Sequence, residues 1–422
     1  MRPPFALFAI LMPVVALYAQ SVRPKDVRDV ARGGSDSLQG LTVFLTDPSR
    51  DVRLEAVKQI TAIGTQRSID PLIQATRDND PEIQIRATDG IVDFYYPGYV
   101  ESGLTGSLKR FTRTVKSKFT DTNDQIIEPY VIVRPEAVAA LARLVTGAGG
   151  MQGRANAARA VGILRGKQAV PELIEGVHSK DSDVIYESLV ALQKVGDQSA
   201  GPRVEFRLRD LDPEVQIAAI DTVGLLRDKD AIPTLTDVLG RAEKADVRRA
   251  ALGALAMIAD PGSRPVFQKY LRDRDEKLRA ASAEGLGRLR NESDLPELEK
   301  AWAEEGKASP RISLAFAQVM LGKPGAGEFA PLQYLINNLN SAAYNGEAFP
   351  FLVELTRDEK VRTQVMAALP NATRDEKIGI ARALARSGDK SSLPALENLS
   401  HDQNTQVADE GLKALRALQA RL

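Results

Sequence analysis

The chain has 422 residues, of which 43% are hydrophobic, 27% charged and 5% aromatic, a composition typical of folded, helix-rich proteins and not of disordered chains. Lysine plus arginine equals aspartate plus glutamate at 56 each, so the net charge gives no support for a nucleic-acid partner. The absence of cysteine excludes disulfides, thiolate metal sites, a cysteine nucleophile and a lipid-anchoring cysteine.

Residues 1–19, "MRPPFALFAILMPVVALYA", begin with one positive charge, continue as an apolar run and end in a small residue. This layout predicts a secretory signal peptide, with cleavage near Ala19 and export to the periplasm or the cell exterior. A retained membrane anchor is the alternative, because Leu17 stands where a cleavage site prefers a small residue. Residues 20–40 are polar and glycine-rich, which predicts a linker or an N-terminal cap.

A proline-containing phrase such as "VPELIEGV" or "IPTLTDVL" recurs along the chain. Its prolines in the longest run are spaced by 31, 31, 32 and 31 residues: Pro171, Pro202, Pro233, Pro265 and Pro296. A second phrase, such as "DVRLEAV" or "PEIQIRA", follows each of the first. Its aligned apolar residues are Val52, Ile83, Val184, Val215, Val247 and Leu278. Two registers that keep one period indicate a repeat protein.

Each unit is predicted to be a pair of helices. Proline is tolerated in the first turn of the first helix, where its missing N–H is not needed. Aspartate is expected to cap the start of the second helix. One pair cannot bury its apolar face alone, so neighbouring pairs must stack and share a core. The predicted array covers residues 41–98, 135–320 and 356–422, while residues 321–355 form a divergent repeat that starts with a Gly/Pro loop.

The phrase D-x-x-V-R-x-x-A followed by A-L resembles bacterial HEAT-like repeats of the phycobilisome-lyase type. The resemblance implies an all-α fold, a right-handed α-solenoid of HEAT-like helix pairs whose second helices line a concave surface. It does not imply lyase activity, because such repeats occur in binding proteins with unrelated roles.

Residues 99–134 form an insertion of about one repeat length that carries neither phrase. Within it, "SLKRFTRTVKSKFT" would form a basic amphipathic helix with Leu108, Phe111, Val115 and Phe119 on one face, although a strand is also compatible. The charged side chains of this stretch are Lys109, Arg110, Arg113, Lys116 and Lys118. Packing of the apolar face on the solenoid is the simple interpretation. An acidic protein groove or an anionic membrane surface is the functional alternative.

Motifs for catalysis or for cofactor binding are missing from the sequence. His178 and His401 are the only histidines, each beside a predicted turn, and neither has metal-ligand spacing. The segment "GKPGAGE" at 322–328 lacks the order of a phosphate loop. "DTNDQIIE" at 121–128 lacks the glycine and glutamate of a calcium loop. We therefore expect no metal, no cofactor and no enzymatic activity.

The sequence favours an exported, non-catalytic scaffold or adaptor that binds a protein or peptide through its concave surface. Polar positions early in the second helices are candidate contacts: Arg53, Arg86, Arg248 and Arg279. Two alternatives stay open. One is a lyase-like enzyme or enzyme subunit of the phycobilisome-lyase type, and the other is a peripheral membrane adaptor that uses the basic insertion.

Overall fold

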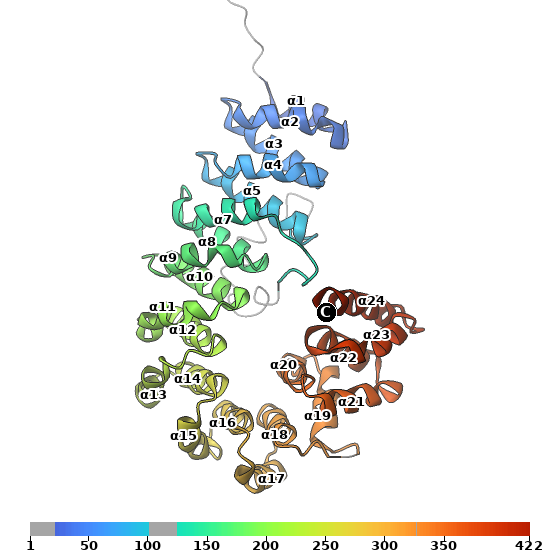
Figure 1. The fold of residues 1–422 in the computed structure, drawn as a ribbon. Coiled ribbons are helices and arrows are strands. Elements are labelled where there is room, and N and C mark those ends of the chain that lie inside the picture. The colour runs from blue at the N-terminus through green and yellow to red at the C-terminus, as the bar shows by residue number, and fades with distance from the viewer. Residues whose placement is uncertain (1–21, 101–124, 326) are drawn as a thin grey trace, which may run out of the picture.

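The computed structural model describes residues 22–100, 125–325 and 327–422. Within these ranges the regular structure is helical, and the helices form a curved, layered array (Figure 1). The prediction of an all-α solenoid of helix pairs is confirmed. No helix of the described residues is both long and apolar enough to span a lipid bilayer.

Each repeat has a first helix, which is often short. These first helices are α2 (Leu38–Val43), α4 (Ile69–Ala75), α7 (Pro135–Gly147), α9 (Val170–Val177), α11 (Gly201–Val204), α13 (Ile232–Arg241), α15 (Arg264–Tyr270), α17 (Leu295–Glu304), α19 (Pro331–Asn337), α21 (Glu359–Ala368) and α23 (Leu393–Ser400). Proline lies at the start of many of them, as in α9, α13 and α17. This position agrees with the prediction, since the first N–H groups of a helix have no partner within it.

The second helices are longer and pack against one another from repeat to repeat. They are α3 (Arg50–Ile63), α5 (Pro81–Tyr95), α8 (Met151–Ile163), α10 (Ser182–Val195), α12 (Pro213–Leu225), α14 (Ala245–Ile258), α16 (Glu276–Leu289), α18 (Ala308–Met320), α20 (Asn345–Leu355), α22 (Arg374–Ser387) and α24 (Thr405–Arg421). Figure 1 shows that α10, α12, α14, α16, α18 and α20 line the inner side of the curve, while α11, α13, α15 and α17 lie outside.

Aspartates cap several second helices as expected. Asp80, Asp212 and Asp275 each accept hydrogen bonds from backbone N–H groups of the first turn. The prediction is wrong for α3 and α14, whereas Asp181 caps α10 as predicted. Asp51 and Asp246 lie within the first turn, and the capping positions are occupied by a serine and a lysine. A carboxylate inside the first turn still stabilises the helix through the dipole.

The segment before the first pair is partly helical. Helix α1 (Pro24–Ala31) packs against α2 and α3, and its Val27 is completely buried. The apolar core then continues between the helix layers. Two groups of core residues meet at α18, where Ala317 belongs to the first group and Phe316 to the second.

Three second helices approach the next one so closely that only glycine fits at the crossing. A Cβ atom placed on Gly162, Gly224 or Gly287 would lie 2.8, 2.8 or 2.6 Å from the Cα atom of an alanine in the next second helix. The alanines are Ala191, Ala254 and Ala317. These crossings fix the distance between neighbouring repeats, because the atoms in contact belong to backbone and cannot rotate away.

The described flanks of the insertion contact the array. Ile127 is buried, and its backbone N–H donates to the carbonyl of Ile163 at 3.0 Å. The backbone N–H of Arg134 donates to the hydroxyl of Tyr95 at 3.1 Å. Residues 125–134 contain no helix, in agreement with an extended flank. The predicted signal peptide and the basic stretch lie outside the described residues.

The divergent repeat begins with a loop in which Gly322, Gly325 and Gly327 have positive φ. Helix α19 follows this loop, and α20 contains Pro350 inside it. The chain therefore keeps alternating first and second helices through this region, although neither sequence phrase is regular there.

Candidate functional site

One position of the second helix recurs every 31 or 32 residues and faces away from the paired first helix. Its members are Arg159, Val190, Asp221, Gly253, Glu284 and Phe316. In α12, Ala219 and Val223 are fully buried, and Asp221 lies on the opposite side at 100° per residue. We call this set the inner row, because the second helices line the inside of the curve (Figure 1).

At the N-terminal end of the inner row, charged and polar side chains pair between repeats. Arg159 of α8 forms an ion pair with Glu187 of α10. Next to it, the side-chain amide of Asn156 donates to Asp89 at 3.1 Å. Burial opposes the charge of Arg159, but Glu187 outweighs that effect and raises the pKa of the guanidinium. These residues mainly join α5, α8 and α10, although the buried Nε atom of Arg159 has no hydrogen-bond partner among the described residues.

Asp221 in the middle of the row differs from these pairs. Burial raises the pKa of its carboxyl group from 3.8 to about 7. No lysine or arginine of the described residues forms an ion pair with it. Its neighbours offer space and apolar surface, because a Cβ atom on Gly253 would meet nothing within 4 Å and Leu225 is 49% exposed. A carboxyl group whose pKa is shifted this far by its surroundings is a candidate for a functional site.

Farther along the inner row, ion pairs join second helices that are two repeats apart, α16 and α20. Arg288 of α16 lies between Glu284 of its own helix and Glu354 of α20, to which its Nη2 atom is 2.8 Å from Oε2. Lys277 of α16 also reaches α20, with its Nζ atom 2.6 Å from Oε1 of Glu347. The phenyl ring of Phe316 in α18 stacks on that of Phe351 in α20 at 4.2 Å. The solenoid is therefore tightly curved at α16–α20.

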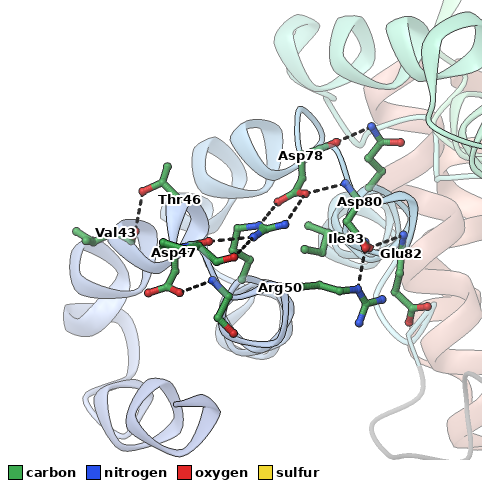
Figure 2. A network of polar contacts seen from close by, with 12 residues as sticks. Val43, Thr46, Asp47, Arg50, Asp78, Asp80, Glu82 and Ile83 are labelled. Atoms are coloured by element: carbon green, nitrogen blue, oxygen red, sulfur yellow. Dashed lines mark hydrogen bonds and ion pairs between the residues drawn. The ribbon is translucent and has the colours of Figure 1, made fainter. Parts of the chain in front are cut away.

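The sequence-predicted contact residue Arg53 belongs to a network between repeats. Its guanidinium pairs with Asp78 at 2.7 Å and donates to the carbonyls of Asp47 and Pro48. Figure 2 shows this network, in which Asp78 receives several donors and Arg50 bonds Asp80 at 2.7 Å. We call an arginine at this place in the second helix a clamp, because it binds the end of its own first helix and the acidic turn of the next repeat.

Arg279 is a second clamp. It pairs with Glu305 through two hydrogen bonds of 2.7 and 3.1 Å and donates to the carbonyl of Asp273. Arg362 of α21, a first helix, makes the same kinds of contact, with Asp389 and the carbonyl of Thr356 after α20. In these three arginines the acid follows by 25, 26 and 27 residues, and this spacing is the sequence signal for the contact.

The other two predicted arginines have different surroundings. Arg86 pairs with Glu82 of the same helix at 3.0 Å. Arg248 is half-buried at the clamp position, and its Nε atom has no hydrogen-bond partner in the described part of the chain. A contact role for all four arginines stays a prediction, and Arg53 and Arg279 have in addition the structural role of clamps. Lys109, Arg110, Arg113, Lys116 and Lys118 lie outside the described residues.

A charged residue at the described end of the insertion interacts electrostatically with the C-terminal repeats. The pKa of Arg382 in α22 is raised mainly by its hydrogen bond with Glu410 and also by the charge of Glu128. Glu128 precedes α7, so two parts of the chain far apart in sequence face each other across the open side of the curve (Figure 1).

Both histidines are exposed, as expected of turn residues, and His178 stacks on Phe206 at 4.5 Å. Three carboxylates that the motif search did not single out, those of Glu205, Asp228 and Asp230, have oxygens within 4.8 Å of one another. Burial raises the pKa values of Glu205 and Asp228. A proton or a cation would relieve their repulsion, so among the described residues these three carboxylates form the group that could hold a metal.

Family comparisons identify the repeats. A model described as HEAT repeats matches residues 36–102, 201–266 and 238–317, and one described as PBS lyase HEAT-like repeat matches residues 153–179. No curated protein matches the sequence.

Solved structures with similar folds have low identity to the chain. An engineered protein is 19% identical, covering 90% of this chain and 98% of its own, with a TM-score of 0.38. The CpcE–CpcF complex of phycocyanin lyase from Nostoc sp. PCC7120 is 19% identical, covering 63% and 92%, with a TM-score of 0.36. Kap95p, solved with RanGDP, is 12% identical, covering 93% and 58%, with a TM-score of 0.44.

The helix pairs, their 31-residue period and the matched repeat models lead to one conclusion. The chain is an α-solenoid of helix pairs, and residues 36–102, 153–179 and 201–317 of it match HEAT-repeat models.

Proposed function

We propose that this solenoid is a non-catalytic scaffold that binds a protein or peptide on its concave surface, between α12 and α16. The observation that carries the proposal is Asp221, a carboxylate on the inner row with no basic partner in the described residues. A basic side chain of a partner would supply the missing cation, and that contact would be strengthened by the low local polarity.

The surroundings of Asp221 define what else the partner must offer. Leu225 lies one turn away on the same helix and is 49% exposed, so it offers an apolar contact. Gly253 on the next second helix leaves open space beside them. A partner segment with a lysine or arginine next to an apolar side chain fits this combination of charge, space and apolar surface.

Site-specific photocrosslinking tests the proposal. A photoreactive phenylalanine replaces Gly253 on α14, and in a control protein it replaces Gly240 on α13 of the same repeat. A Cβ atom added to either glycine would meet nothing within 4 Å, so neither replacement is expected to disturb packing. Irradiation of cells should give adducts from position 253 that are absent from position 240 and weakened by Asp221→Asn. Equal adducts from both positions would contradict a concave binding surface.

We also propose that the scaffold acts outside the cytoplasm. The support is the charge and apolar pattern of residues 1–19. Intact-mass measurement of the protein from the native host should show a chain that begins near Gln20. A full-length chain recovered from the cytoplasmic fraction would overturn this part of the proposal.

A further inference from the structure

A cavity of about 240 Å³ lies where five second helices come together at the tight curve. Its lining comes from the C-terminal ends of α12, α14, α16 and α18 and from the region of α20: Arg227, Ala259, Arg288, Arg290, Met320, Glu354 and Arg357. Four of these side chains are arginines and one is an acid. Since α16 and α20 are joined directly by Arg288 and Glu354, the same curvature that forms this ion pair also forms the cavity.

Acidic side chains of the cavity lining do not neutralise the positive charge of its arginines. Arg288 is paired with Glu284 and Glu354, which accounts for the only acid in the lining. Arg227, Arg290 and Arg357 form no ion pair with any carboxylate of the described residues. Within the described residues, the side chain of Arg290 makes one hydrogen bond, to the sulfur atom of Met320 at 4.0 Å. Three solvent-exposed arginines therefore line one open cavity without an ion-pair partner in the described part of the protein.

The backbone at two of these arginines has an unusual conformation. Arg227 and Arg290 have φ of 56° and 53°, in the left-handed region that favours glycine. Each closes its helix three residues after a close-crossing glycine, in the sequences "GLLR" and "GRLR". Glycine would fit this backbone with less strain. Arg165 and Ala259 share the conformation, so it is a recurring feature of the repeats, and a binding role is inferred from the lining of the cavity alone.

We propose that the cavity binds a compact multivalent oxyanion carrying phosphate or carboxylate groups. Guanidinium groups match both kinds of oxyanion, with two parallel N–H donors for two oxygens. The cavity has room for roughly eight water molecules at about 30 Å³ each, which is the size of a small ligand. Because the lining residues come from five repeats, the ligand would also join these repeats together.

The test uses glycine substitutions, because glycine relaxes the left-handed backbone while it removes the charge. The variants are Arg227→Gly, Arg290→Gly and the double variant. Arg165→Gly is the matched control, since Arg165 ends α8 in the same "GILR" sequence with φ of 50° and does not line the cavity. Circular dichroism should show all variants folded and at least as stable as the parent.

Calorimetric titration of the full chain with pyrophosphate, citrate and chloride measures binding. We expect pyrophosphate or citrate to bind, and the better of the two identifies whether phosphate or carboxylate is preferred. Affinity should fall about tenfold or more in each single variant, as expected for loss of charge-assisted hydrogen bonds, and stay unchanged in Arg165→Gly. Three results would overturn the proposal: no binding of either anion at millimolar concentration, unchanged binding in the double variant, or equal loss in the control.

Discussion

The close glycine crossings lead to a quantitative prediction for Gly287→Ala. A Cβ atom at this position would lie 2.6 Å from the Cα and 2.9 Å from the Cβ of Ala317. Carbon atoms pack at about 3.5–4.0 Å, so helices α16 and α18 would have to separate by about 1 Å. Gly253→Ala is the matched control, because that glycine is also inside a second helix and its Cβ would meet nothing within 4 Å.

Two opposing effects give the magnitude. Alanine is favoured over glycine in a helix interior by about 1 kcal/mol, and this gain applies to both variants. Overpacking costs about 1–3 kcal/mol, and the upper end applies to Gly287 because the obstructing atoms include backbone. The free energy of unfolding should therefore decrease by about 2 kcal/mol for Gly287→Ala and increase by up to about 1 kcal/mol for Gly253→Ala.

Urea denaturation followed by circular dichroism measures the global effect. Repeat arrays can open locally, so hydrogen exchange of peptides from α16 and α18 should accompany it. Faster exchange is expected in these two helices for Gly287→Ala only. If Gly287→Ala is as stable as Gly253→Ala and exchanges no faster, the close crossing does not limit the packing of repeats and the reasoning is refuted.

Three further predictions concern charged groups. Burial raises the pKa of Asp221 from 3.8 to about 7, so its ionisation progressively destabilises the folded state between these pH values, by at most about 4 kcal/mol. Asp221→Asn should therefore stabilise the protein at pH 8 and not at pH 4 in urea titrations; an equal effect at both would contradict the raised pKa. Arg279→Ala should lower the free energy of unfolding by about 2–4 kcal/mol, because Glu305 would lose its partner. Arg274→Ala, at an exposed position, should lower it by less than about 0.5 kcal/mol, and urea titration measures both. Glu354→Ala should open the tight curve and increase the radius of gyration in small-angle X-ray scattering. Glu359→Ala, at an exposed helix start, should not. Identical radii of gyration in the two variants would contradict the role of the ion pair between α16 and α20.

The repeat period predicted the helix pairs well, because helix starts and core spacing are local properties of the sequence. Pro171 and Pro233 begin first helices, and Asp80 and Asp212 cap second helices. The exceptions, such as Asp246, arise because a capping residue and a first-turn residue are only two positions apart. Local sequence favours a carboxylate at either position.

The candidate sites were less accessible from the sequence. Arg53 was selected as a polar residue early in a second helix, but its partner Asp78 belongs to the next repeat. The pair between Arg288 and Glu354 requires a superhelix curved enough to bring α16 and α20 together. That curvature is a sum of small rotations at successive crossings, and no single sequence window contains it.

The ion pairs across two repeats affect how the whole array would respond to force. In an ordinary solenoid each repeat contacts only its neighbours, so the resistance to bending is similar along the whole array. Here Arg288–Glu354 and Lys277–Glu347 tie α16 directly to α20. The segment from α16 to α20 should therefore bend less than the repeats before and after it. High salt would weaken the exposed Lys277–Glu347 pair more than the largely buried Arg288–Glu354 pair, because screening acts mainly on exposed charges.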